Sequence, residues 1–240
     1  MHPAALALTA FAASAVLVGC AGGGVPTVST VTSPTGRVQI VLRWPERPAT
    51  ATRLVPFATN SVNVSFLATD GTTLRSQLLV RPTPAPLATG DPPPISSTAT
   101  FTNLPQGLVN VRATAFPNPD GTGVAQATAT VPTTIVAGQL TPVKLAMGST
   151  ISYVDILPHQ IQLTGKPVLL NAVAYDAQNN VVLTDQWTWT NSDPTVITMR
   201  PSGALDYISA VGPGVTILTA TETDSGKSFA KTINVAPLTN

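Results

Sequence analysis

This sequence of 240 residues is poor in the residues that carry most protein chemistry. It has one cysteine and two histidines, charged residues make up 10% of it, and aromatic residues make up 5%. A single cysteine excludes a disulfide within the chain, so an exported domain must be held together by its hydrophobic core alone. The net charge of +1 provides no overall field that would favour nucleic acid or an acidic membrane surface.

The same scarcity argues against catalysis and against a metal site. Apart from His2, the only histidine is His159, which follows Pro158 in a predicted loop and is interpreted as a solvated side chain. Neither a cluster of His, Cys and carboxylate ligands nor a Gly-x-Ser-x-Gly motif is present. Residues 225–228 (SGKS) resemble the end of a phosphate-binding loop, but their strand–turn–strand context predicts a hairpin turn. We expect no catalytic residue, no metal ligand and no cofactor; calcium at a sandwich end is an alternative without a supporting Asp-x-Asp-x-Asp spacing.

Thr, Val, Ala, Pro and Gly dominate what remains, and this composition favours short strands separated by turns. In residues 37–44, the apolar side chains of Val38, Ile40, Leu42 and Trp44 alternate with polar ones, as in a half-buried strand. The acids Asp70, Asp120, Asp193 and Asp224 each lie beside Gly, Pro or Ser and are predicted turn residues. The strands expected in the first half are 37–44, 61–67, 74–80, 97–101, 108–116, 124–131 and 140–147.

The N-terminus predicts export. Residues 3–19 are uncharged and largely apolar, and small residues and a Gly-rich segment follow them, as in a signal peptide with a processing site. The four residues Leu17, Val18, Gly19 and Cys20 resemble the lipobox of bacterial lipoproteins. The resemblance implies that 1–19 is a lipoprotein signal peptide recognised at Leu17, Val18 and Gly19, and that the Cys20 thiol is diacylated. An ordinary signal peptide and a retained membrane span are the two alternatives.

Residues 20–35 are predicted to form a flexible linker that starts at the lipidated cysteine. A chain of this composition has an end-to-end distance of roughly 20 Å, which would lift the first domain clear of the lipid headgroups. Two or more acyl chains make attachment stable, whereas a single chain holds a protein only marginally. We expect an exported protein anchored by lipid at the cell envelope, at the outer membrane or cell surface.

A first domain is expected at 36–148. Its residues 101–111 (FTNLPQGLVNV) resemble the phrase F-x-x-L-P-x-G-x-Y-x-V of prealbumin-like or carboxypeptidase-regulatory-like β-sandwich domains, with Val109 in place of the usual Tyr. In that family the phrase is a structural turn between two strands. The domain also holds a Pro-rich segment, 81–96, which we interpret as a long crossover loop or, alternatively, as an exposed partner-binding loop.

A second domain is expected at 149–240. Its order and spacing of residues are set by Ile156, Pro158, Leu163, Gly165, Leu170, Ala172, Trp189, Asp193, Pro194, Val196, Gly203, Gly212 and Gly214, followed by 217–221. This pattern resembles the group 2 bacterial immunoglobulin-like domain, also found in intimin and invasin-type surface proteins. Trp187 and Trp189 share one face of a predicted strand; Trp189 is expected in the core, and a carbohydrate platform is the alternative for the pair.

The two predicted domains differ in charge. Residues 36–148 have eight Lys and Arg against four acids, a net charge of +4, and residues 149–240 have four against seven, a net charge of −3.

Taken together, the patterns of the chain predict an all-β protein: two tandem Ig-like or prealbumin-like β-sandwiches behind a cleaved signal peptide and a tether. The expected function is a non-catalytic structural spacer or adhesion module. A specific glycan- or protein-binding module, using loop 81–96 or a sandwich end, is the alternative. Expected partners are the membrane and an envelope protein or polysaccharide, without nucleic acid.

Overall fold

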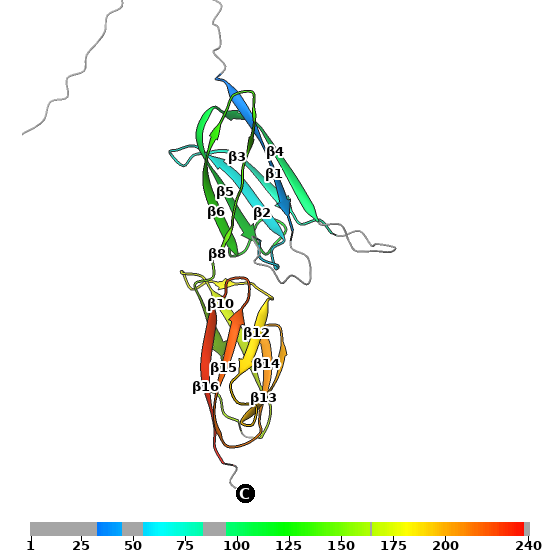
Figure 1. The fold of residues 1–240 in the computed structure, drawn as a ribbon, viewed down its shortest axis with the longest axis vertical. Coiled ribbons are helices and arrows are strands. Elements are labelled where there is room, and N and C mark those ends of the chain that lie inside the picture. The colour runs from blue at the N-terminus through cyan, green and yellow to red at the C-terminus, as the bar shows by residue number, and fades with distance from the viewer. Residues whose placement is uncertain (1–32, 45–54, 84–94, 164, 238–240) are drawn as a thin grey trace, which may run out of the picture. The chain divides into compact units, whose positions relative to one another are not determined.

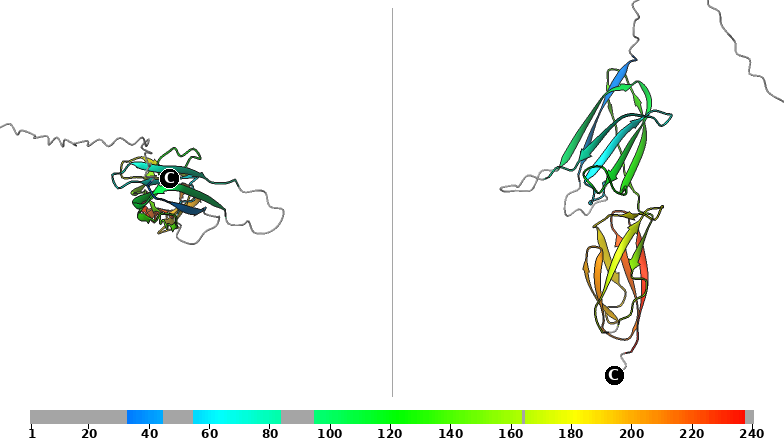
Figure 2. Two further views of the ribbon diagram at one scale, coloured as in Figure 1. Left: turned by 90° about the horizontal axis from the view of Figure 1, so that it is seen from above. Right: turned by 180° about the vertical axis from the view of Figure 1, so that it is seen from behind.

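The computed structural model describes residues 33–44, 55–83, 95–163 and 165–237, and within them every regular element is a β-strand (Figure 1). The strands build two β-sandwiches in succession, and Figures 1 and 2 show the layers from opposite sides. The predicted all-β sandwich fold is confirmed. The described residues contain no helix long and apolar enough to cross a membrane.

The first sandwich consists of a three-stranded sheet in the order β4-β1-β7 and a five-stranded sheet in the order β3-β2-β5-β6-β8. Every pairing is antiparallel except that of β1 with β7. The strands are β1 (Thr35–Arg43), β2 (Ser61–Leu67), β3 (Thr73–Val80), β4 (Ser96–Pro105), β5 (Gly107–Phe116), β6 (Ala127–Ile135), β7 (Leu140–Pro142) and β8 (Gly148–Ser149).

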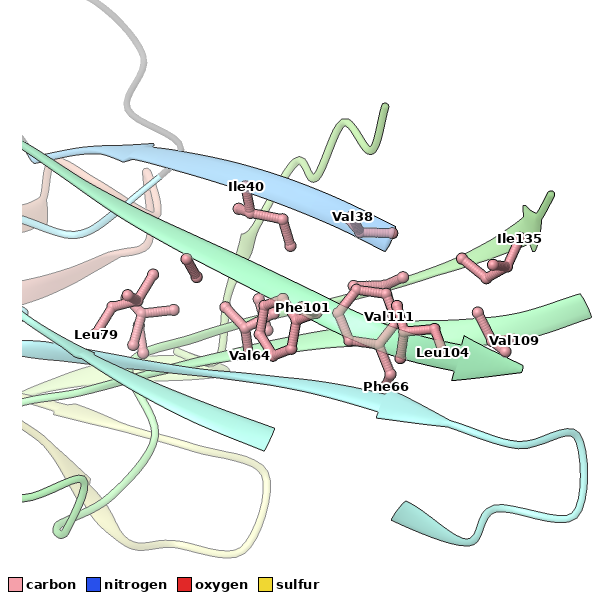
Figure 3. Close-up of a cluster of buried hydrophobic side chains, with 14 of the residues drawn as sticks. Val38, Ile40, Val64, Phe66, Leu79, Phe101, Leu104, Val109, Val111 and Ile135 are labelled. Carbon is pink, nitrogen blue, oxygen red and sulfur yellow. The ribbon is translucent and has the colours of Figure 1, made fainter. Parts of the chain in front are cut away.

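The core of the first sandwich follows from the alternation in its strands. The four predicted inward side chains of residues 38–44 all lie in or against it. Figure 3 shows Val38 and Ile40 on β1 directed toward the layer that holds Val64 and Phe66 of β2. Phe66 and Phe101 pack with their ring centroids 4.6 Å apart, so aromatic contact joins the two sheets at the centre.

The phrase at 101–111 forms the corner between the two sheets. β4 ends at Pro105 in one sheet and β5 begins at Gly107 in the other. Phe101 and Leu104 before the turn and Val109 and Val111 after it are buried. Gly107 has a φ of 121°, which is open to glycine and strained for other residues. The prediction of a structural turn joining two strands is confirmed.

One predicted strand, 140–147, is wrong in its extent. β7 ends at Pro142, because proline has no N–H to continue a ladder, and residues 143–147 run on without regular structure. Gly148 and Ser149, on the two sides of the predicted domain boundary, form β8 and pair with β6. The predicted strand 124–131 is also displaced, since β6 begins only at Ala127.

The second sandwich pairs a sheet in the order β11-β10-β14-β13, with β9 beside β10, and a sheet in the order β12-β15-β16. Its strands are β9 (Tyr153–Leu157), β10 (Val168–Tyr175), β11 (Val181–Val182), β12 (Trp187–Asn191), β13 (Ile197–Ser202), β14 (Leu205–Ala210), β15 (Gly214–Glu222) and β16 (Ser228–Val235). Its main core contains buried side chains from β9, β10 and β12 to β16.

Trp189 links the two sheets of the second sandwich. Its side chain is 8% exposed within the core, and its indole N–H donates to the carbonyl oxygen of Gly203 at 3.0 Å. Gly203 lies in the turn between β13 and β14 of the opposite sheet, with a φ of 62°. The predicted core role of Trp189 is confirmed, and one side chain provides both apolar contact and a hydrogen bond between the sheets.

We expect Trp189→Ala to lower the free energy of unfolding by about 3–5 kcal/mol, because it leaves a large cavity in the core. Trp189→Phe keeps a ring but leaves the Gly203 carbonyl without its donor, and should cost about 1–3 kcal/mol. Thr190→Ala, at the next and exposed position of β12, should change stability by less than about 0.5 kcal/mol. Urea denaturation followed by circular dichroism measures all three, and unchanged stability in Trp189→Phe would contradict the role of the hydrogen bond.

Candidate functional site

The predicted anchor residues Leu17, Val18, Gly19 and Cys20 lie outside the described residues, as do the linker up to residue 32 and residues 84–94 of the Pro-rich segment. Lipidation therefore stays a prediction.

The described start of the Pro-rich segment is held in place. The Arg81 guanidinium donates to the carbonyl oxygen of Phe57 at 2.8 Å and lies 5.0 Å from the centroid of its ring.

The structure brings no catalytic constellation to His159. Its side chain is 69% exposed, as predicted, and its Nε2 lies 2.6 Å from Oδ2 of Asp155. The ammonium group of Lys231 donates to the carbonyl oxygens of Ile156 and Pro158, and burial lowers the Lys231 pKa against the opposing effect of Asp155. In the described part of the chain, no three His, Cys, Asp or Glu side chains gather in a way that would hold a metal ion.

The phosphate-loop-like residues 225–228 connect β15 with β16, as predicted, in a hairpin turn. The N–H of Glu222 donates to the carbonyl oxygen of Lys227 at 2.8 Å. The buried Glu222 carboxylate accepts hydrogen bonds from the hydroxyl groups of Thr184 and Ser225 and from the backbone N–H of Ser225. These hydrogen bonds stabilise the turn. They occupy the Glu222 carboxylate, which has no role in binding a phosphate.

Three of the predicted turn aspartates form the same local structure. In each, Oδ1 accepts from both the backbone N–H and the hydroxyl of a threonine two residues later. These hydrogen bonds stabilise the charged carboxylate and lower the pKa of each aspartate. The pairs are Asp70 with Thr72, Asp120 with Thr122, and Asp193 with Thr195. Their acidity is a property of turn geometry and does not indicate a binding site.

The two tryptophans of β12 do not form an exposed platform. Trp189 is buried, and Trp187 is half-buried, packed against two apolar clusters. The indole N–H of Trp187 is also shielded from solvent and has no hydrogen-bond partner among the described residues. Core packing thus accounts for both side chains, and the carbohydrate-platform interpretation of this pair is wrong.

An exposed apolar surface lies instead on the outer face of the β11-β10-β14-β13 sheet. Alternation along each strand directs one set of side chains into the core and the other set outward. Tyr153 and Tyr207 are 40% and 48% exposed. We call this surface the tyrosine face; it consists of Tyr153, Leu169, Tyr175, Val181, Leu205 and Tyr207.

Strand register places the members of the tyrosine face in two groups, one toward each end of β10. Tyr175 on β10 is opposite both Tyr153 on β9 and Val181 on β11, and Leu169 is opposite Tyr207 on β14. The rings of Tyr153 and Tyr175 stack with their centroids 4.9 Å apart and an angle of 14° between their planes. The Tyr153 hydroxyl donates to Oδ1 of Asn179 at 3.0 Å. The Tyr153 side chain is therefore fixed both by the stack of its ring and by the hydrogen bond of its hydroxyl.

Sequence analysis missed the tyrosine face, although β10 carries a signal for it. Residues 168–175 (VLLNAVAY) are apolar at seven of eight positions, which is the pattern of a strand covered on both faces. The structure covers only the inner face with its own core. A strand that is apolar on both sides but covered on one indicates a surface suited to a partner.

One buried acid on the inner side of the same sheet remains incompletely paired. The Asp206 side chain is 0% exposed; its Oδ1 accepts the N–H of Arg200 at 2.8 Å, and its Oδ2 has no hydrogen-bond partner in the described part of the chain. Burial raises the pKa of Asp206, because removal from water disfavours the carboxylate more than this one hydrogen bond favours it.

Comparisons with known proteins leave the family open. No family model matches the chain, and no curated protein matches it. Among solved structures, the chain is similar to the C-terminal 282-residue fragment of intimin, in complex with the intimin-binding domain of the translocated intimin receptor. The identity is 13%, the match covers 82% of this chain and 57% of the fragment, and the TM-score is 0.27. The chain therefore spans little more than half of that fragment.

Asp206 leads to a prediction about pH. Its folded-state pKa lies above the unfolded value, so the folded protein binds the proton more tightly, and stability falls as the pH rises through this interval. Asp206→Asn should remove that fall and be more stable than the unsubstituted protein at neutral pH. Asp120→Asn is the control with opposite sign: it removes a stabilisation that is present above the unfolded pKa and lost as pH falls. Urea midpoints from pH 3 to 8 test both, and a stability difference for Asp206→Asn that does not change with pH would refute the assignment.

Proposed function

We propose that the protein is a non-catalytic, lipid-anchored component of the cell envelope that acts as a spacer and interaction module. The lipobox-like residues 17–20 and the flexible composition of the linker support the anchor. Two sandwiches in succession, each with its own core, support the spacer.

The tyrosine face carries the interaction part of the proposal. Exposed apolar surface on a folded domain is suited to an interaction, and tyrosine is enriched at protein interfaces because it combines a large apolar ring with a polar hydroxyl. The Tyr153–Tyr175 stack and the bond to Asn179 hold these rings in place before binding, which reduces the entropy lost on association.

The partner that this face fits best is a protein. A sugar ring stacks on the open face of an aromatic side chain, whereas Tyr153 and Tyr175 each use one ring face on the other. Aliphatic side chains at Leu169, Val181 and Leu205 add apolar area that offers a sugar no hydrogen bond. A glycan ligand and the use of loop 81–96 remain the alternative, which the tests below distinguish.

Metabolic labelling with a fatty-acid analogue tests the anchor. Label should appear on the full chain expressed in a bacterium with lipoprotein processing, and Cys20→Ser should abolish it, because the cysteine thiol is the proposed acylation site. Cys20→Ser should also move the protein from the membrane fraction into the soluble exported fraction, since the acyl chains provide the membrane affinity. Label that persists in Cys20→Ser would disprove the proposed attachment.

Retention on isolated cell envelopes tests the tyrosine face. Beads that carry the full chain with Cys20→Ser, so that no acyl group binds the membrane, should be retained. Tyr153→Ser combined with Tyr207→Ser should reduce this retention about tenfold or more, as loss of central aromatic side chains does at interfaces. Ile217→Ser is the matched control, because Ile217 is 49% exposed on the outer face of the opposite sheet.

Treatment of the envelopes separates the partner classes in that experiment. Protease digestion should abolish retention, whereas periodate oxidation of glycans should leave it intact. Retention that resists protease and is lost after periodate would refute a protein partner and favour the glycan alternative. Equal losses for the tyrosine and Ile217 variants would refute the tyrosine face as the contact surface.

A further inference from the structure

A cavity opens in the first sandwich at the point where β1 loses its neighbour. Arg37, Val38 and Gln39 pair in parallel with β7, and this pairing ends at Pro142. β1 continues to Arg43, paired with β4 on its other side alone. The three-stranded sheet is therefore only two strands wide along the second half of β1.

The free edge of β1 faces this opening. The N–H of Trp44 donates to Ile95, on the β4 side of the strand. Because backbone groups alternate in direction along an antiparallel edge, those of Val41 and Arg43 are directed to the opposite side. On that side the chain continues as residues 143–147, whose side chains Val143, Leu145 and Met147 are half-buried against the core. These residues cover the sandwich without forming a ladder with β1.

The resulting cavity has a volume of about 550 Å³ and reaches the buried interior between the sheets. Ile40 of β1 lies on one side of it, and Val62 and Val64 of β2 and Ala113 of β5 lie on the other; Figure 3 shows Ile40 and Val64 on the two layers. Cavities of roughly 300–1,000 Å³ with mainly apolar walls are typical of small-molecule sites.

Among the described residues, the only charged ones that line the cavity are cations. Arg43 and Lys144 are both exposed, and no ion pair involves either of them in the described part of the chain. The other described residues that line it are apolar. Two exposed positive charges beside an apolar cavity attract an anion, and the net charge of +4 on residues 36–148 adds to that attraction.

We propose that this cavity binds a free single-chain anionic amphiphile of the fatty-acid class. The aliphatic chain lies between the sheets against Ile40, Val64 and Ala113, and the carboxylate lies at the rim beside Arg43 and Lys144. Burial of the chain provides affinity in proportion to the apolar area removed from water, and the two cations select the anionic head. The site is independent of the proposed lipid anchor and of the tyrosine face.

Isothermal titration of the full chain with dodecanoate, below its micelle concentration, tests the proposal. Cys20→Ser is included in every sample, so that no acyl group on the chain competes. Dodecanoate should bind with one-to-one stoichiometry, and dodecanol, which has the same chain without the charge, should bind about tenfold more weakly. Arg43→Gln and Lys144→Gln should each weaken dodecanoate about threefold to tenfold and leave dodecanol unchanged, as expected for the loss of one charge-assisted contact.

Two further variants separate the cavity from unspecific binding. Ala113→Leu fills the interior and Val143→Phe fills the side next to β1, and both should reduce dodecanoate binding at least tenfold. Arg112→Gln is the matched control: Arg112 precedes Ala113 on β5 but is exposed on the outer face, and its loss should have no effect. Circular dichroism melting identifies variants that fail to fold, and the surface variants Arg43→Gln and Lys144→Gln keep the test decisive if Ala113→Leu is one of them.

Several outcomes would overturn the proposal. Absence of dodecanoate binding would show that the cavity is closed to this ligand in solution, by another part of the chain or by a second copy. Equal affinity for dodecanoate and dodecanol would refute the role of the two cations. Unchanged affinity in folded Ala113→Leu and Val143→Phe would place the ligand elsewhere, for example on the apolar N-terminal residues 3–19.

Discussion

Both sandwiches depend on the burial of apolar side chains between two sheets. With one cysteine in the chain, no disulfide joins the sheets. Contacts such as the Phe66–Phe101 pair and the Trp189–Gly203 hydrogen bond hold the two sheets of each sandwich together instead. Inward positions are accordingly filled with Val, Ile, Leu, Phe and Ala. This constraint also explains why the few polar groups inside, such as Glu222, are almost fully hydrogen-bonded.

The strands of the first sandwich were the easiest part to predict, because alternation between one buried and one exposed face has a clear period of two. β2 has the predicted bounds, 61–67, and the four inward residues of 37–44 are correct. The prediction failed at 140–147, where the apolar pattern continues past Pro142 but the ladder does not. Periodicity shows which side chains face the core; it does not show whether a neighbouring strand is there to pair with the backbone.

For the candidate sites, features with local causes were predicted correctly, and features that depend on strand pairing were missed. The exposed His159, the turn at 225–228 and the turn aspartates were interpreted correctly, since each has local causes in sequence. The tyrosine face depends on register: Tyr153 and Tyr175 are 22 positions apart and meet only because β9 pairs with β10. The buried Asp206 was hidden for a similar reason, because Leu205-Asp206-Tyr207 has its apolar residues outside and its acid inside, the reverse of the usual order. No composition or period indicates such an inversion before the sheet is assembled.

The parallel pairing of β1 with β7 has a mechanical consequence. A load applied between the start of β1, at Thr35, and the chain that leaves β7 after Pro142 pulls the two strands past each other along their length. The paired residues Arg37–Leu140, Val38–Thr141 and Gln39–Pro142 then resist together in shear, whereas an antiparallel hairpin pulled at its open ends would yield one bond at a time. For a domain held by its N-terminus at a surface and pulled from its other end, the load passes β8 and its pairing with β6 and then meets this short ladder, which resists in shear.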